Sequence, residues 1–212
     1  MALRSSLDDF AATTKGDWSI IWAAGNATTS TGQREADREL DVFTSFAGLL
    51  KHQRPLGRGV FAFISSAGGV YAGSARPPVT SNTPPLPLGA YGKLKLEQER
   101  VARGLAQDLP VVSLRLSNLY GPGQNLNKLQ GVISRLALAA ITRQPITMFV
   151  PLDTLRDYIF TDDAADRALH WVSVSLSSQH SATRIVASGQ AATLGHVIAV
   201  MNDITRVRVP IA

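Results

Sequence analysis

Two hydrophobic patterns alternate along the chain. Short continuous apolar runs are typical of strands buried on both faces of a parallel sheet, and they occur at 18–24, 60–65, 110–116 and 183–187. Segments with apolar residues three or four positions apart predict helices. These helical segments lie at 3–14, 36–52, 91–105, 132–141, 161–174 and 193–205. The alternation predicts an α/β fold, a parallel sheet with flanking helices.

Three further segments have weaker patterns. Residues 73–90 are rich in Pro, Ser, Thr and Gly and predict a loop. The short apolar run at 145–150 predicts another strand, and a turn is expected at 153–155.

Polar side chains next to the 60–65 strand form a candidate proton-transfer site. Tyr91 and Lys95 share one helix face because they are four residues apart. An adjacent ammonium favours the phenolate, so we expect Lys95 to lower the pKa of Tyr91. Ser65 or Ser66, at the strand end, could hydrogen-bond a substrate oxygen. This set suits alcohol and carbonyl chemistry, although a Tyr and a Lys at this spacing also occur as a plain surface pair.

Two later motifs follow in order behind this site. The string RLSNLYGPGQ at 115–124 comes directly after a predicted strand and places Asn118 at the end where open α/β sheets bind ligands. The string RDYIFTDDA at 156–164 carries Arg156, whose planar guanidinium can bind phosphate oxygens in pairs. The alternatives are a structural turn for Asn118 and a salt bridge to a nearby Asp for Arg156.

Together, SSAGGVY at 65–71, YGKLK at 91–95 and these two strings resemble the NAD-dependent epimerase/dehydratase family of the extended short-chain dehydrogenase/reductase superfamily. The resemblance implies a partial Rossmann-type parallel sheet and a small substrate-side annex. We expect one truncated domain over 1–212, with its core at about 1–121 and 158–190. The annex would then be about 122–157 and 191–212.

The resemblance also implies roles for individual residues. Tyr91 would exchange the proton of a sugar hydroxyl, with Lys95 binding the nicotinamide ribose and Ser66, or Ser65, binding the same oxygen. Ala24 and Gly25 would let the cofactor approach the strand end, although small residues there also suit plain packing. The implied substrate is a nucleotide-diphosphate sugar, held by Asn118, Arg156 and Tyr158.

The family's Gly-x-x-Gly-x-x-Gly phosphate loop does not occur in these 212 residues. We therefore expect a chain that lacks the first βαβ units and has lost affinity for NAD. The residue that separates NAD from NADP is also outside this sequence, so both cofactors stay open. Two alternative functions follow: an NAD(P)-dependent reductase of the same superfamily, or an inactive binding module that contacts RNA.

The amino-acid composition limits the kinds of ligand and partner that we expect this protein to bind. The net charge is +5, but the basic residues are dispersed, which disfavours a nucleic-acid partner and suits phosphorylated small molecules. With no Cys and four scattered His, we expect no metal site. The sequence contains no signal peptide or membrane span, so a cytoplasmic location is expected. A homodimer is a candidate assembly, and the sequence leaves the oligomeric state open.

Overall fold

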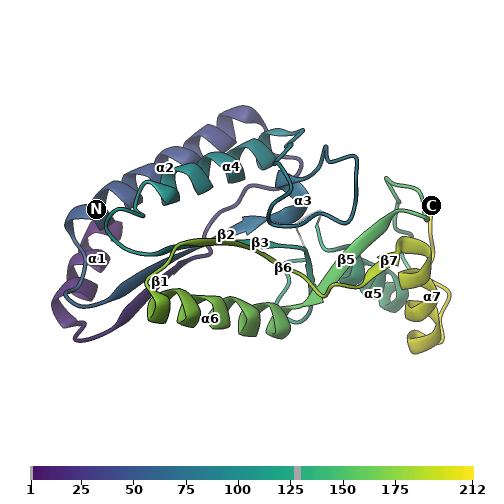
Figure 1. Cartoon of the computed structure of the whole chain (residues 1–212). Coiled ribbons are helices and arrows are strands. Elements are labelled where there is room, and N and C mark those ends of the chain that lie inside the picture. The colour runs from purple at the N-terminus through teal and green to yellow at the C-terminus, as the bar shows by residue number, and fades with distance from the viewer. Residues whose placement is uncertain (1, 127–129) are drawn as a thin grey trace. The chain divides into compact units, whose positions relative to one another are not determined.

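The computed structural model describes residues 2–126 and 130–212 (Figure 1). The chain forms two compact units, each described by itself. Unit 1 comprises Met1–Leu116 and Arg167–Val186, and unit 2 comprises Ser117–Asp166 and Ala187–Ala212. The sequence predicts boundaries between core and annex at about residues 121, 157 and 190. Part of the predicted annex, residues 127–129, lies outside the described part of the chain.

Unit 1 is built on an all-parallel sheet of four strands in the order β1-β2-β3-β6, with β1 at an edge. Its strands are β1 (Trp18–Trp22), β2 (Gly59–Ser66), β3 (Val111–Leu116) and β6 (Ala182–Val186). Two helices, α2 (Gln33–His52) and α4 (Ala90–Arg103), lie side by side over one face, and α6 (Thr161–Ser178) lies over the other (Figure 1). The prediction of a parallel sheet with flanking helices is confirmed.

Aromatic packing holds α2 on the sheet. Phe43 of α2 lies 5.1 Å from Phe63 of β2, measured between ring centroids, and Phe46 lies 4.5 Å from Trp22 of β1. Burying each such side chain contributes about 1.5–3 kcal/mol. These contacts fix the α2 face that is turned toward the candidate site.

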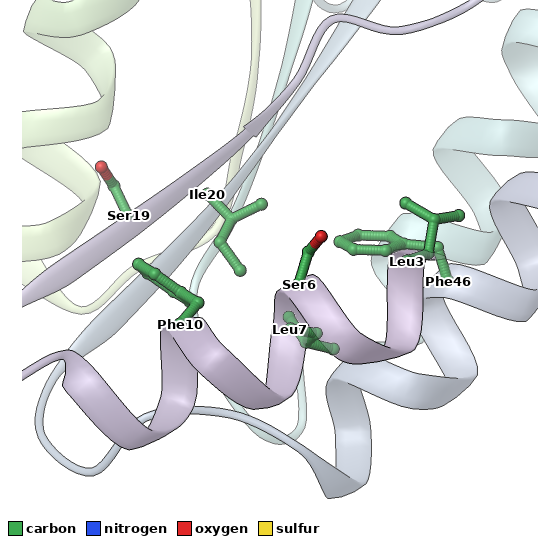
Figure 2. Close-up of a pocket in the computed structure, with 7 residues that line it drawn as sticks. All are labelled: Leu3, Ser6, Leu7, Phe10, Ser19, Ile20 and Phe46. Carbon is green, nitrogen blue, oxygen red and sulfur yellow. The ribbon is translucent and has the colours of Figure 1, made fainter. Parts of the chain in front are cut away.

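The first helix, α1 (Ala2–Thr13), adds an apolar face to unit 1. A surface pocket lies between this helix, β1 and α2 (Figure 2). It is lined by Leu3, Ser6, Leu7, Phe10, Ser19, Ile20 and Phe46. None of the residues predicted to form a functional site lines it.

The segment after β2 contains an element that the sequence patterns did not predict. β2 runs directly into a one-turn helix, α3 (Ala67–Val70). The Pro-rich loop that follows was predicted correctly. It is held to the core by hydrogen bonds from the backbone N–H of Leu86 to the carbonyl of Val70 and from the Tyr71 hydroxyl to the carbonyl of Thr80.

Unit 2 combines a small mixed sheet with two packed helices. In this sheet β4 pairs in parallel with β5, and β5 pairs antiparallel with β7. Leu136 of α5 and Leu194 and Ile198 of α7 share an apolar cluster. The elements are β4 (Asn118–Tyr120), β5 (Leu155–Phe160), β7 (Ala191–Thr193), α5 (Val132–Thr142) and α7 (Leu194–Thr205).

Several predictions for unit 2 are wrong. Residues 145–150 do not form a strand: only Ile146 pairs, in an isolated bridge to Ile211. The three strands of this sheet were not predicted. Asn118 lies on one of them, β4, so the alternative of a structural turn at this residue does not hold. Outside unit 2, the helix predicted at 161–174 is longer than expected, since α6 continues to Ser178.

Candidate active site

The candidate acid/base, Tyr91, lies in the first turn of α4 against α3. A Cβ on Gly69 would lie 3.0 Å from the Tyr91 ring, and a Cβ on Gly92 would collide with the carbonyl oxygen of Gly69. These two glycines therefore let the backbone of α3 and the start of α4 meet closely. Ser66 caps α3, since its hydroxyl accepts a hydrogen bond from the Gly69 N–H at 3.1 Å. The close packing holds Tyr91 and Ser66 in one place.

Lys95 is buried behind Tyr91, with 8% of its surface exposed. Its Nζ lies 5.9 Å from the Tyr91 ring centroid and 5.3 Å from that of Phe63. The shared helix face predicted for Tyr91 and Lys95 is therefore present. Across from it, Oε1 of Glu39 on α2 lies 3.9 Å from Nζ.

Burial sets the protonation of this pair. It raises the pKa of Tyr91, while an interaction with the Ser66 hydroxyl lowers that pKa and the charge of Glu39 raises it further. The expectation that Lys95 lowers the pKa of Tyr91 is wrong: the pKa is raised, and desolvation of the phenolate is the largest cause. Burial also lowers the pKa of Lys95, and Glu39 acts in the opposite direction. Near neutral pH Tyr91 is thus a phenol that can donate its proton.

The Ser65 hydroxyl is hydrogen-bonded within a buried network of charged side chains. It donates to Oε1 of Glu99 at 2.6 Å. Arg115 donates to the same carboxylate through Nε at 2.8 Å and Nη2 at 2.6 Å, and also to the Tyr71 hydroxyl. Glu99 has no exposed surface and Arg115 has 4%. Of the two serines, Ser66 is the one whose hydroxyl interacts with Tyr91.

The predicted cofactor residues Ala24 and Gly25 lie just after β1. The Glu39 carboxylate, which faces Lys95, also contacts the backbone there. The Glu39 Oε2 accepts hydrogen bonds from the backbone N–H groups of Asn26 at 2.8 Å and Ala27 at 2.9 Å. Gly25 has φ +149°, and a Cβ there would lie 2.5 Å from Oε1 of Glu39. Sequence reasoning missed Glu39. Its signal was a charge within the apolar stripe of α2, between Ala36 and Phe43.

The predicted substrate residues belong to unit 2. Asn118 of β4 is in register with Tyr158 of β5, and its Nδ2 donates to the carbonyl of Asp157 at 2.8 Å. Arg156 is exposed, and its Nη1 donates only to the carbonyl of Leu155, at 3.0 Å. Within residues 2–126 and 130–212 Arg156 forms no salt bridge, so the structural alternative proposed for it is absent. Burial raises the pKa of Tyr158, against a lowering by Arg156.

The carboxylate of Asp157 on β5 joins the residue before β4 to the loop before β7. It accepts from the Ser117 hydroxyl at 2.6 Å, from the backbone N–H and hydroxyl of Ser188, and from the N–H of Gly189 at 2.8 Å. Burial acts to raise its pKa, but these hydrogen bonds outweigh burial and the pKa is lowered. The carboxylate therefore fixes the backbone on which Arg156 and Tyr158 stand.

Two negative findings apply to the described residues alone. They contain no cluster of three or more His, Cys, Asp or Glu placed to hold a metal ion. No helix among them is long and apolar enough to cross a membrane.

Two curated proteins match about half of this chain. The chain is 33% identical over 123 residues to dTDP-L-rhamnose 4-epimerase of Burkholderia thailandensis, covering 56% of this chain and 33% of that protein. It is 36% identical over 103 residues to dTDP-4-dehydro-6-deoxyglucose reductase of Escherichia coli, covering 48% and 32%. The chain thus matches about a third of the length of these curated relatives.

Solved structures show the same fold. MoeE5 in complex with UDP-glucose and NAD superposes with a TM-score of 0.85 at 23% identity, over 100% of this chain and 68% of that one. UDP-glucose 4-epimerase of Brucella ovis in complex with NAD gives a TM-score of 0.85 at 20% identity, over 100% and 68%. The model of the NAD dependent epimerase/dehydratase family matches residues 2–184, and this chain belongs to that family.

Proposed function

We propose that Tyr91 is the acid/base of an NAD-dependent epimerase or dehydratase that transiently oxidises a hydroxyl group of a nucleotide-diphosphate sugar. The observation that carries this proposal is the packing of a protonated Tyr91 between Ser66 and Lys95. Such a phenol can donate a proton to a sugar carbonyl oxygen, and Ser66 can hydrogen-bond the same oxygen. In the reverse direction the phenolate accepts the proton of the sugar hydroxyl, and a nearby positive charge favours that form.

The residues present fit the nicotinamide end of the cofactor, whereas these 212 residues contain no Gly-x-x-Gly-x-x-Gly loop for its pyrophosphate. Within the described chain the Lys95 ammonium has no acceptor at hydrogen-bond distance, and Oε1 of Glu39 is buried without a donor. Unsatisfied polar atoms of this kind suit the hydroxyl groups of a ribose. Lys95 and Tyr91 would hold this ribose, and Ala24 and Gly25 offer small residues for close approach. Bound NAD would supply the hydride acceptor.

The substrate proposal rests on unit 2 and on the relatives. The exposed guanidinium of Arg156, which forms no salt bridge with another described residue, suits a diphosphate. Asn118 of β4 and Tyr158 of β5 are in register beside it. MoeE5 was solved with UDP-glucose, and dTDP-L-rhamnose is in the name of one epimerase relative. We infer that the substrate is a UDP- or dTDP-linked sugar. We further infer that the protein works in the cytoplasm, as a monomer or as a homodimer.

Replacing Tyr91 with Phe tests the acid/base role. Turnover of UDP-glucose and dTDP-linked sugars should fall by about 10²–10⁴-fold, the usual contribution of a general acid/base. The matched control is Tyr120→Phe, which removes a hydroxyl from a half-buried tyrosine with no proposed role. The proposal fails if Tyr91→Phe and Tyr120→Phe turn over substrate equally well.

A reductase of the same superfamily is the second candidate, favoured by the identity to the Escherichia coli reductase. The two functions differ in cofactor balance. A reductase consumes NADH or NADPH in proportion to product, whereas transient oxidation leaves the amount unchanged. Absorbance at 340 nm during turnover therefore separates them.

A further inference from the structure

The carboxylate of Glu39 connects two parts of unit 1 that both belong to the candidate cofactor region. Its Oε2 accepts hydrogen bonds from the N–H groups of Asn26 and Ala27, which follow Gly25 in the loop after β1. Its Oε1 faces the ammonium of Lys95 at 3.9 Å. One side chain on α2 thus reaches the loop after β1 and the catalytic face of α4.

This contact depends on the missing side chain at position 25. A Cβ on Gly25 would lie 2.5 Å from Oε1 of Glu39 and 3.0 Å from its Cδ. The φ of +149° at Gly25 is also one that other residues rarely adopt. Gly25 therefore admits the Glu39 carboxylate against the backbone, which is a different reason for a glycine from the cofactor approach inferred above.

The charges of Glu39 and Lys95 lie close together and are mostly shielded from water. The side chain of Glu39 is 16% exposed and that of Lys95 is 10% exposed, so solvent screens the pair weakly. The other groups packed against Lys95 are the Phe63 ring of β2 and the Tyr91 ring of its own helix. Glu99, one turn further along α4, is paired with Arg115 instead. Among the described residues Glu39 is thus the carboxylate that faces Lys95.

We propose that Glu39 is a positioning residue of the Tyr91 site, which anchors the loop after β1 through Oε2 and keeps Lys95 protonated and oriented through Oε1. The proposal rests on the proposed function, because it assigns Glu39 a role through Lys95 and not a contact with substrate. Without the carboxylate, a buried Lys95 would lose its proton more easily. It would then no longer bind ribose hydroxyls as a cation.

The test is the titration of Lys95 in the whole chain without cofactor. The sequence has five lysines, so protein with ¹⁵N- and ¹³C-labelled lysine gives few side-chain signals to assign by NMR. Glu39→Gln should move the Lys95 midpoint to lower pH. Glu35→Gln is the control, since Glu35 is exposed on the same helix and the change in charge is the same. Equal Lys95 midpoints in wild type and Glu39→Gln would overturn the proposal.

A measurement on the wild-type chain keeps the proposal testable if Glu39→Gln does not fold. The amide protons of Asn26 and Ala27 and the Lys95 side chain all contact one carboxylate, so their signals should change with a common midpoint as the pH is lowered. Different midpoints, or no response at Lys95, would overturn the contact. Calorimetry with NAD and UDP-glucose on the same samples tests the proposed function separately. A shifted Lys95 midpoint in Glu39→Gln without any ligand binding by wild type would support the Glu39 contact and count against the enzyme activity.

Discussion

The two units hold their polar groups in opposite ways. In unit 1, Glu99, Arg115 and Lys95 are buried, and each faces an oppositely charged group on a different element. In unit 2, Arg156 and Asn118 are exposed on strands, and the carboxylate of Asp157 holds the residues next to these strands. The chemistry proposed for unit 1 is therefore fixed by folding itself, whereas the groups proposed for substrate binding are available to a ligand. We therefore expect mutations of the buried charges in unit 1 to lower stability, and mutations of the exposed groups in unit 2 to weaken ligand binding.

The largest effect on stability is expected at Glu99. Glu99→Ala leaves the buried Arg115 without its carboxylate, and breaking a buried ion pair in this way costs about 3–5 kcal/mol of the free energy of unfolding. Urea unfolding measures it. The control is Glu97→Ala on the same helix, whose pair with Arg100 is exposed and contributes about 0–1 kcal/mol. Similar losses in both variants would show that the buried network is not special.

The adjacent serines give the next test. Ser65→Ala removes a buried hydrogen bond to a charged group and should cost about 1.5–3 kcal/mol of stability. Ser66→Ala removes a helix cap, which costs about 1 kcal/mol, and should have the larger effect on turnover. Urea unfolding and steady-state kinetics on both variants are needed. Greater loss of turnover in Ser65→Ala than in Ser66→Ala would reverse the assignment of the two hydroxyls.

A smaller effect is expected from acid in unit 2. The hydrogen bonds to Asp157 overcome burial and hold its pKa below the ordinary value of 3.8. A lowered pKa in the folded state means that Asp157 contributes stability above about pH 3.8, and that this contribution disappears as the pH falls through the folded pKa. Unfolding of wild type and Asp157→Asn, measured from pH 7 to pH 3, should show curves that converge toward acid. Parallel curves would show that the carboxylate charge is not what these hydrogen bonds stabilise.

The sequence predicted unit 1 better than unit 2. Its four strands are continuous apolar runs that pair with neighbours throughout, so the pattern alone identified them. The three-residue strands β4 and β7 carry no such pattern, because their pairing depends on β5, more than 30 residues away from each. The apolar run at 145–150 lacks a partner strand apart from Ile211. Apolar runs therefore predict strands only where a sheet is present to receive them.

For the candidate site, the sequence predicted the shared helix face of Tyr91 and Lys95 but not the electrostatics around them. The spacing of Tyr91 and Lys95 identified the shared helix face. The pKa of Tyr91 depends on burial and on Glu39, which lies 52 positions earlier in the sequence, and spacing reports neither. Charged residues within apolar stripes, such as Glu39 and Glu99, were the available signal for both buried contacts.

The smallest effect on stability is expected at Arg156, where binding should change instead. Arg156→Ala removes an exposed side chain with no salt bridge among the described residues, so the free energy of unfolding should change by less than about 0.5 kcal/mol. Losing a charge-assisted hydrogen bond to a diphosphate should weaken binding of UDP-glucose by about 10- to 100-fold.

Calorimetry on Arg156→Ala and Arg208→Ala decides between a site and a general attraction. Arg208 is also exposed in unit 2, and its removal changes the net charge by the same amount. If the affinity falls equally in both variants and high salt abolishes the difference from wild type, the excess positive charge of the chain attracts the diphosphate without a defined site. A loss confined to Arg156→Ala that persists in high salt requires a guanidinium held at one position, which is what the pairing of β5 with β4 and β7 provides.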